Sequence, residues 1–273
     1  MNIELAELYL FFNNFYMTLN IPYLYFSKKM KILNSLFYFI FLSFHFISCA
    51  QIDKKDSKIV LKEHNNQLEK RKTSTYPGLE KLTEVIKLDS TIQVSLKYAT
   101  LDNFTKKILY TEIYSAYLQN DVALGLVKSN QYLKTRNPNL RLLIYDAVRP
   151  VSVQKLMWDA LDTIPILQRR KFVSDPSKGS LHNYGCAVDI TICDQKGQPL
   201  DMGSPYDDIN LIAYPIHENR FLNQGLLSVA QIKNRELLRE TMRIGGFSGI
   251  KTEWWHFNAC SLKTAALKYP ILK

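Results

Sequence analysis

One short segment sets a condition that the fold of this chain has to meet. Cys186-Ala187-Val188-Asp189-Ile190-Thr191-Ile192 is a compact apolar and β-branched run, which predicts a strand, and it carries one carboxylate at its centre. An unpaired carboxylate between Val188 and Ile190 would be costly. A metal ion would neutralise that charge. Our first hypothesis is therefore a metal site at Asp189, and the alternative is an aspartate at the surface.

The rest of the chain predicts both helices and strands. Strands are expected over Thr91–Tyr98 and Leu140–Tyr145, and helices over Asp121–Tyr132, Pro150–Leu161 and Val229–Ile244. Asp121 and Ser228 stand where N-caps are expected, and Gly245 follows the last helix. Because these elements show no strict βαβ alternation, the sequence favours a single α+β domain with a mainly antiparallel central sheet flanked by helices.

The beginning of the chain resembles an export signal. Lys28-Lys29-Met30-Lys31 precedes an apolar run from Ile32 to Ile47, and Cys49 follows Ser48. A basic region, a hydrophobic core and a small residue before the break are typical of a secretory signal, and a Cys directly after the break indicates a lipoprotein. The alternative is a retained transmembrane anchor, but the run is shorter than the ~20 residues that an anchor needs.

These features predict the organisation and location of the chain. We expect a leader at residues 1–48, with Met30 as a second candidate start, a charged tether at 49–75 and a folded domain at 76–273. Lipid on Cys49 would hold the domain against the membrane, on the periplasmic side of the cell envelope. The formal charge is +10, but the Lys and Arg residues are scattered and no nucleic-acid-binding motif is present. We therefore expect no nucleic-acid partner, and we infer no protein partner.

Two histidines stand in unusual company. His182 precedes Asp189 by seven positions with Gly185 between them, which can bring an imidazole and a carboxylate to one metal ion. His256 follows Glu253 by three positions, with Trp254 and Trp255 between them. On a helix Glu253 and His256 would share a face, whereas a strand would need a bulge or a turn. The alternative for the two Trp residues, that they simply belong to the core, is compatible with either arrangement.

The remaining histidines have no comparable neighbours. His45 lies in the predicted leader, His64 in the predicted tether, and His217 has no acidic or histidine partner nearby in the sequence. Two His and one Asp would give three protein ligands and leave a fourth position open, which is typical of catalytic zinc. Another divalent ion could occupy the same set of ligands.

Taken together, the motifs resemble those of the zinc D-alanyl-D-alanine dipeptidase family, which is related to the zinc D-Ala-D-Ala carboxypeptidases. The resemblance rests on His182-x6-Asp189 and Glu253-x-x-His256, on Tyr98-Ala99-Thr100-Leu101-Asp102-Asn103-Phe104, on Tyr145-Asp146-Ala147-Val148-Arg149-Pro150 and on Asp201-Met202-Gly203-Ser204-Pro205-Tyr206-Asp207. It covers about Leu96 to Phe257. The resemblance implies the fold of the zinc D-Ala-D-Ala peptidases, which is Hedgehog-like, with the zinc site on the sheet.

The resemblance also implies roles for individual residues. One zinc ion per chain would be held by His182, Asp189 and His256, and Glu253 would be the general base and acid. Arg149 would stabilise the oxyanion of the tetrahedral intermediate, and a structural salt bridge between Arg149 and Asp146 is the alternative. Tyr98 and Asp207 would bind the free ammonium of a dipeptide, and Ser180 would help to bind the substrate near the metal.

The implied reaction is hydrolysis of the D-Ala-D-Ala dipeptide to two D-alanines. In an exported enzyme this reaction fits cell-wall turnover or scavenging. Two alternatives remain: a carboxypeptidase or endopeptidase acting on peptidoglycan stem peptides, and a non-catalytic wall-binding module. The presence of Glu253 counts against the module, because loss of the base is its usual mark.

Three cysteines follow Cys49. Cys193 comes just after the predicted Asp189 strand and Cys260 just after His256. We therefore hypothesise a Cys193–Cys260 disulfide that braces the metal site. The alternative is that Cys186, Cys193 and Cys260 are three buried thiols.

Overall fold

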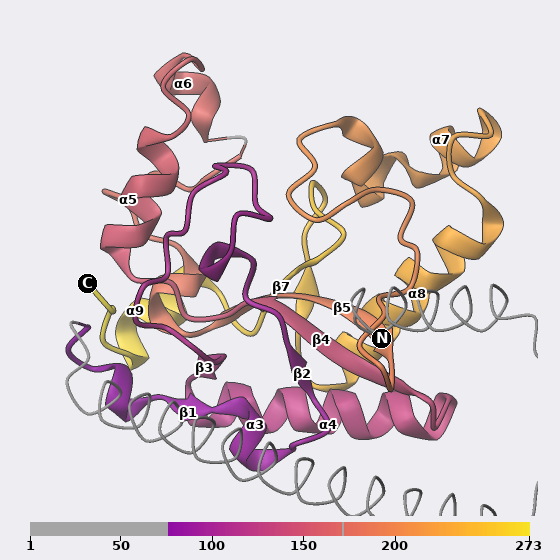
Figure 1. Cartoon of the computed structure of the whole chain (residues 1–273), viewed down its shortest axis with the longest axis horizontal. Coiled ribbons are helices and arrows are strands. Elements are labelled where there is room, and N and C mark those ends of the chain that lie inside the picture. Colours follow the sequence, from indigo (N-terminus) through magenta and orange to yellow (C-terminus); the bar gives the residue numbers. More distant parts are fainter. Residues whose placement is uncertain (1–75, 171) are drawn as a thin grey trace, which may run out of the picture. The chain divides into compact units, whose positions relative to one another are not determined.

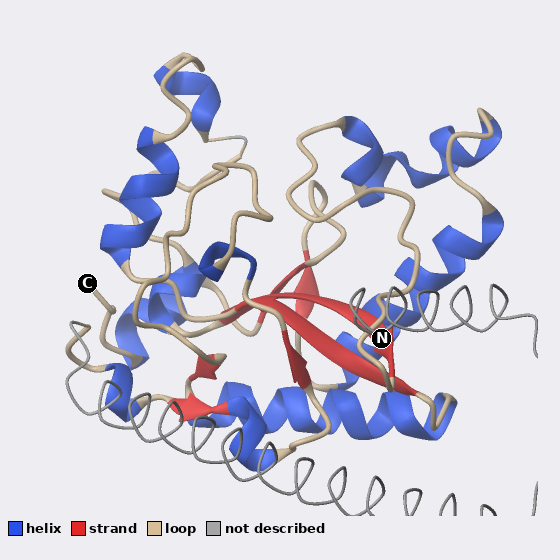
Figure 2. Ribbon diagram, in the orientation of Figure 1, coloured by secondary structure: helices blue, strands red, loops and turns tan. Residues whose placement is uncertain are grey.

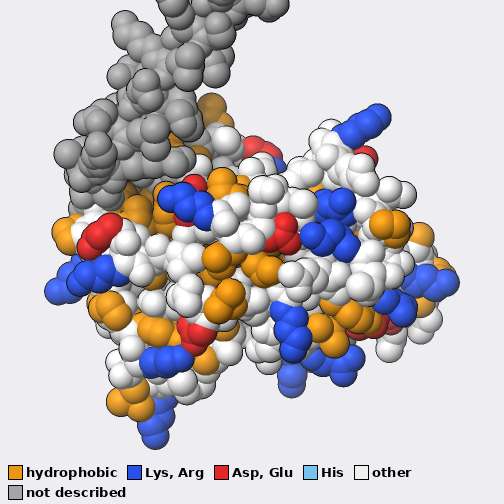
Figure 3. Space-filling model, turned by 90° about the horizontal axis from the view of Figure 1, so that it is seen from below, with side chains coloured by type: hydrophobic (Ala, Val, Ile, Leu, Met, Phe, Trp, Pro, Cys, Tyr) orange, Lys and Arg blue, Asp and Glu red, His pale blue; other side chains and the backbone are white. Residues whose placement is uncertain are grey.

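The computed structural model describes residues 76–170 and 172–273. The predicted leader, the tether, Met30 and Cys49 lie outside the described residues. Within the described part, none of the helices has the length and apolar character that crossing a membrane requires. On the face shown in Figure 3, Lys and Arg side chains lie in separate groups among hydrophobic and neutral residues.

A twisted sheet forms the centre of the described residues (Figures 1 and 2). Its strands lie in the order β2 (Gln93–Val94), β4 (Leu140–Asp146), β5 (Ala187–Asp194), β7 (His256–Asn258) and β6 (Ser248–Gly249). Only β2 and β4 run parallel, and the other neighbouring strands are antiparallel. The predicted α+β fold with a mainly antiparallel sheet is confirmed. A smaller antiparallel pair is formed by β1 (Thr83–Glu84) and β3 (Tyr117–Leu118).

Two long helices pack against the sheet, one of them along the side that is lowest in Figure 1. They are α4 (Asn120–Arg136) and α8 (Val229–Ile244), which contact each other as well as β4 and β5 respectively. Gly125 and Gly245 allow this crossing, since a Cβ added to Gly125 would lie 2.5 Å from the Gly245 carbonyl oxygen. Ser228 caps α8 through its side chain, which accepts a hydrogen bond from the Gln231 N–H, as expected.

Shorter elements stand on the other side of the sheet (Figure 1). They include α5 (Val151–Asp159), α6 (Ile166–Arg169), η4 (Leu211–Ala213), η5 (Pro215–His217) and α7 (Glu218–Asn223). The remaining elements are η1 (Leu79–Lys81), α3 (Val85–Leu88), η2 (Lys97–Ala99), η3 (Leu181–Tyr184) and α9 (Leu262–Lys268). A separate hydrophobic cluster lies beneath α5 and includes Tyr98, Tyr110, Val153 and Met157. The main core includes Leu142, Ile144, Val188, Ile190 and Leu126.

The central strands β4 and β5 are irregular at one point. Ile144 pairs with Ile190, but the next pair is Asp146 with Asp189, so Tyr145 is the extra residue of a bulge. A bulge re-aims the side chains that follow it. Here it places a second carboxylate, that of Asp146, opposite Asp189, the residue at which the sequence predicted a metal site.

Two local predictions are wrong. The predicted strand Thr91–Tyr98 is limited to β2, and the chain then turns into η2, which holds Tyr98. Tyr98 leaves the sheet edge because its backbone carbonyl accepts hydrogen bonds from Leu109 and Tyr110. Asp121 is not the N-cap of α4, which begins at Asn120, and its carboxylate instead accepts hydrogen bonds from Lys268 of α9 and from Tyr269.

Candidate active site

The three predicted metal ligands come together from two neighbouring strands and the turn before them. Asp189 lies on β5 directly opposite His256 on β7, and His182 lies on η3, immediately before β5. His256 Nδ1 is 2.9 Å from Asp189 Oδ1, His182 Nε2 is 3.3 Å from the same oxygen, and the two ring nitrogens are 3.2 Å apart. Among the described residues, these three side chains form a group that could hold a metal ion.

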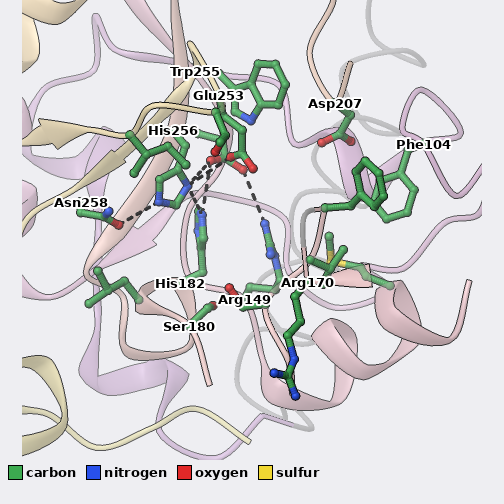
Figure 4. A pocket seen from close by; sticks show the side chains of 18 of the residues that line it. Phe104, Arg149, Arg170, Ser180, His182, Asp207, Glu253, Trp255, His256 and Asn258 are labelled. Atoms are coloured by element: carbon green, nitrogen blue, oxygen red, sulfur yellow. Dashed lines mark hydrogen bonds and ion pairs between the residues drawn. The ribbon is translucent and has the colours of Figure 1, made fainter. Parts of the chain in front are cut away.

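Each imidazole is oriented by a hydrogen bond on its far side, and Figure 4 shows the one between His256 and Asn258. His182 Nδ1 lies 2.7 Å from the Ala147 carbonyl oxygen, and His256 Nε2 lies 2.8 Å from Asn258 Oδ1. Both partners accept hydrogen bonds, so both outer nitrogens donate. His182 Nε2 and His256 Nδ1 therefore turn toward Asp189 as the atoms available to a cation.

The electrostatics of this group favour a cation between the three side chains. Burial works against ionisation of Asp189, but His182 and His256 hold the pKa of its carboxyl well below the usual range. Burial also lowers the pKa of His256, but its hydrogen bond to Asp189 outweighs this effect and raises the pKa to about 9. The site thus attracts a positive charge, which a proton or a metal ion can supply.

Glu253 lies beside the ligands, in the turn before β7. Its Oε2 atom is 3.9 Å from His256 Nδ1. The sequence left open whether a helix or a turn brings Glu253 and His256 together. The structure shows that a turn does so. Burial raises the pKa of Glu253 to about 7, against the lowering effect of His256. A carboxyl group with such a pKa can both accept and donate a proton near neutral pH.

Arg149 forms the salt bridge that the sequence analysis considered. Its Nε and Nη2 atoms donate to Asp146 Oδ2 at 2.9 and 2.6 Å. Nη2 is also 3.5 Å from Asp189 Oδ2, and the guanidinium lines the same cavity as the metal ligands. The salt bridge therefore fixes the guanidinium at the edge of the cavity, so the two readings of Arg149 are compatible.

Tyr98 and Asp207 form a pair in the same cavity. The Tyr98 hydroxyl is 3.1 Å from each carboxylate oxygen of Asp207. Burial raises the pKa of Asp207 to about 8, and the nearby Asp189 carboxylate adds to this effect. Asp207 also has a φ of 61°, a left-handed conformation that is uncommon outside glycine and is found at functional sites.

One cavity of about 360 Å³ is lined by all of the predicted catalytic, substrate-binding and metal-binding residues. The residues that the sequence singled out and that line it are Tyr98, Arg149, Ser180, His182, Asp189, Asp207, Glu253 and His256. Figure 4 shows Asp207 and Phe104 on one side of the cavity and the His182–His256 group on the other. The cavity therefore brings together the metal-binding group, the Glu253 carboxyl, which can act in acid–base chemistry, and the separate carboxyl of Asp207.

Comparison with known proteins identifies the family. A family model described as D-ala-D-ala dipeptidase, Peptidase_M15, matches residues 78–270. This chain belongs to the peptidase M15 family. The predicted family is thereby confirmed, and the chain is a metallopeptidase of a family that uses zinc.

Two relatives with similar sequences support the assignment to the M15 family. The D-alanyl-D-alanine dipeptidase of Escherichia coli is 35% identical over 181 residues, which cover 66% of this chain and 83% of the relative. The enzyme of the same name from Synechocystis sp. is 29% identical over 169 residues, 52% of this chain and 68% of the relative. A solved structure of the vancomycin resistance D,D-pentapeptidase VanY in complex with Zn(II) is 15% identical, covers 56% of this chain and 78% of VanY, and gives a TM-score of 0.32.

The residues of this M15 peptidase fit zinc. Two neutral imidazole nitrogens and one carboxylate oxygen are the donor types that catalytic zinc prefers. Tetrahedral zinc with bonds of about 2.0–2.1 Å places its ligand atoms roughly 3.3 Å apart. The distances among the three side chains, 2.9, 3.3 and 3.2 Å, are close to that value. His182, Asp189 and His256 would therefore hold the ion.

Some residues around the M15 site were not predicted from the sequence. Asn258 orients His256, and Gln154 accepts a hydrogen bond of 2.7 Å from the Ser180 hydroxyl. Tyr206 donates its hydroxyl to Asp189 Oδ2 at 3.0 Å. The period of two along a strand, which puts Asn258 on the same face as His256, could have indicated Asn258. His217, set aside in the sequence analysis, stacks on Tyr214 and does not join the metal-binding group.

The predicted Cys193–Cys260 disulfide is wrong. Cys186, Cys193 and Cys260 are all free thiols, and the Cys186 thiol donates to the Tyr184 carbonyl oxygen at 3.6 Å. The reason is the antiparallel pairing of Asp189 with His256. Each residue beyond that pair moves along its strand by about 3.3 Å in opposite directions, so Cys193 and Cys260 diverge.

Proposed function

We propose that this M15 peptidase hydrolyses free D-alanyl-D-alanine to two molecules of D-alanine and uses one zinc ion per chain. The observation that carries the proposal is the hydrogen-bonded pair of the buried Tyr98 and the partly buried Asp207, which shares a cavity with the metal-binding group. A carboxylate at that position can bind the free N-terminal ammonium of a dipeptide, which a longer peptide would not have there. The names of the relatives, which are D-alanyl-D-alanine dipeptidases, support the choice of dipeptide.

The main polar groups of the cavity each have a task in this reaction. Asp207 accepts the substrate ammonium, and Tyr98 holds the Asp207 carboxylate in place. Arg149, fixed by Asp146, offers a positive charge to the scissile carbonyl oxygen as negative charge develops there. Glu253 takes a proton from the attacking water and returns it to the leaving amine, since its pKa of about 7 suits both steps. Zinc bound by His182, Asp189 and His256 would act as a Lewis acid toward water and the carbonyl.

The decisive experiment compares free D-Ala-D-Ala with a stem pentapeptide that ends in D-Ala-D-Ala. The full chain is loaded with zinc, and D-alanine release is measured for both substrates. Since the pentapeptide has an amide where the dipeptide has an ammonium, it cannot form the charge pair with Asp207, and loss of such a pair costs about 2 kcal/mol or more. We expect a kcat/KM for the pentapeptide at least ~30-fold lower. Equal or faster cleavage of the pentapeptide would instead identify a carboxypeptidase.

We also propose that the protein is exported and tethered by lipid on Cys49, where it would recover dipeptide released during wall turnover. The basic segment Lys28–Lys31, the apolar run that follows it and the position of Cys49 support this proposal. Metabolic labelling with palmitate tests it, with Cys49→Ser as the control. Labelling of the wild type alone is the expected result, and equal labelling of both, or of neither, would contradict it.

A further inference from the structure

The second oxygen of the Asp189 carboxylate has partners of its own. While Oδ1 faces His182 and His256, Oδ2 accepts a hydrogen bond of 3.0 Å from the Tyr206 hydroxyl and lies 3.5 Å from Arg149 Nη2. The carboxylate of a buried Asp189 has no proton to give, so the hydroxyl must be the donor. The two oxygens of Asp189 are therefore distinguished by their surroundings, one turned to the imidazoles and the other away from them.

Aromatic packing fixes the place of the Tyr206 ring. Its centroid lies 5.1 Å from that of Tyr145, 5.4 Å from that of Trp255 and 6.3 Å from that of Tyr98. Tilted and edge-on contacts of this kind restrict the ring on several sides. The hydroxyl consequently reaches Asp189 from a position that the surrounding core determines.

We infer that Tyr206 is a positioning residue of the metal centre, whose hydroxyl restricts Asp189 to one metal-facing oxygen. The inference rests on the zinc site of the proposed function. A catalytic zinc site needs three protein ligand atoms and one open position. If Oδ2 were free to turn inward, Asp189 could supply two atoms and crowd the open position. The hydrogen bond from Tyr206 opposes that rotation, as partners of metal-binding carboxylates commonly do.

Tyr206 also stands next in sequence to a residue of the proposed substrate site. It is followed directly by Asp207, the residue that Tyr98 contacts at 3.1 Å. One loop thus supplies a contact to a metal ligand and the carboxylate proposed for the ammonium. Because the ring of Tyr206 carries the packing and its hydroxyl carries the Asp189 contact, loss of the hydroxyl alone should affect the metal and not the position of Asp207.

The test is Tyr206→Phe in the full chain, which removes the hydroxyl and keeps the ring. Zinc affinity is measured by competition with a chromophoric chelator, and the absorption spectrum of the Co(II)-loaded protein reports the ligand geometry. Loss of such an outer partner typically weakens metal binding 10- to 100-fold. We expect at least a ~10-fold weaker zinc affinity, an altered Co(II) spectrum, activity restored by excess zinc, and an unchanged KM for the dipeptide.

Tyr145→Phe is the matched control, because Tyr145 packs on the Tyr206 ring and makes no hydrogen bond to Asp189. It should leave zinc affinity and the Co(II) spectrum unchanged. The inference fails if Tyr206→Phe binds zinc as tightly as the wild type, or if Tyr145→Phe weakens binding equally, since packing would then be the cause. A raised KM without a change in zinc affinity would also overturn it. Absence of zinc binding by the wild type would instead refute the proposed zinc site.

Discussion

Replacing Asp207 with Asn should impair recognition of the substrate while leaving the metal centre intact. The amide keeps an oxygen that can accept the hydrogen bond from Tyr98, at present 3.1 Å long, but it carries no charge. The perturbation therefore removes the electrostatic contact to the substrate ammonium and little else.

The size of the effect follows from two opposing terms. Leaving a buried charge without its partner costs about 2–5 kcal/mol, and we take ~3.5 kcal/mol. The pKa of Asp207 is about 8, so its ionisation at pH 7 already costs the wild type ~1.4 kcal/mol. The difference of ~2 kcal/mol corresponds to a decrease of about 30-fold in kcat/KM.

The assay is D-alanine release from D-Ala-D-Ala and from its N-acetylated form, which has no ammonium. Asp207→Asn should lower kcat/KM for the free dipeptide by about 30-fold and lower that for the acetylated one far less. Asp208→Asn is the matched control, since its carboxylate already accepts a hydrogen bond from the Asn210 N–H. Equal losses on both substrates, or no loss at all, would refute the assignment of Asp207 to the ammonium.

Three other outcomes are expected. Asn258→Ala should weaken zinc binding about 10-fold in a chelator competition, and Asn258→Asp, which keeps the acceptor for His256, should bind zinc more tightly than the Ala variant. The kcat/KM of the wild type should rise from pH 6 to about 8 as Glu253 and Asp207 ionise, and then fall because the amine of the dipeptide loses its proton at about 7.7–8.0. Ser228→Ala should lower the free energy of unfolding by ~1 kcal/mol in a urea titration without changing zinc affinity, because Ser228 only caps α8. No change in zinc affinity, a flat pH profile or an unchanged unfolding midpoint would contradict these predictions in turn.

The sequence predicted a metal site at Asp189 because this part of the chemistry is local, and the family resemblance joined His182 and His256 to it. A carboxylate in an apolar strand has to be compensated, and that condition identified Asp189 without knowledge of the fold. The structure places Asp189 opposite His256, and the charge is indeed compensated by imidazoles and by the Tyr206 hydroxyl. The long capped helix α8 was predicted with its observed bounds for a similar reason, since its cap and periodicity lie within one segment.

Contacts between distant segments could not be predicted in this way. The hydrogen bond from Tyr206 to Asp189 depends on the course of a loop, and the bulge at Tyr145 has no sequence signal. The error over Cys193 and Cys260 arose because closeness in sequence to two paired residues was taken as closeness in space. In an antiparallel pair the two chains run apart from that point, and only the strand register reveals it.

The central claim is tested most directly by D-alanine release from D-Ala-D-Ala by the zinc-loaded full chain, run beside Glu253→Gln and an L-Ala-L-Ala control. Glu253→Gln keeps the shape of the side chain and removes its ability to take a proton. The account predicts hydrolysis of the D-dipeptide, at least ~100-fold less activity in the variant, and no comparable cleavage of the L-dipeptide. Undiminished activity of Glu253→Gln, or no hydrolysis of the dipeptide by a protein that binds zinc, would contradict it.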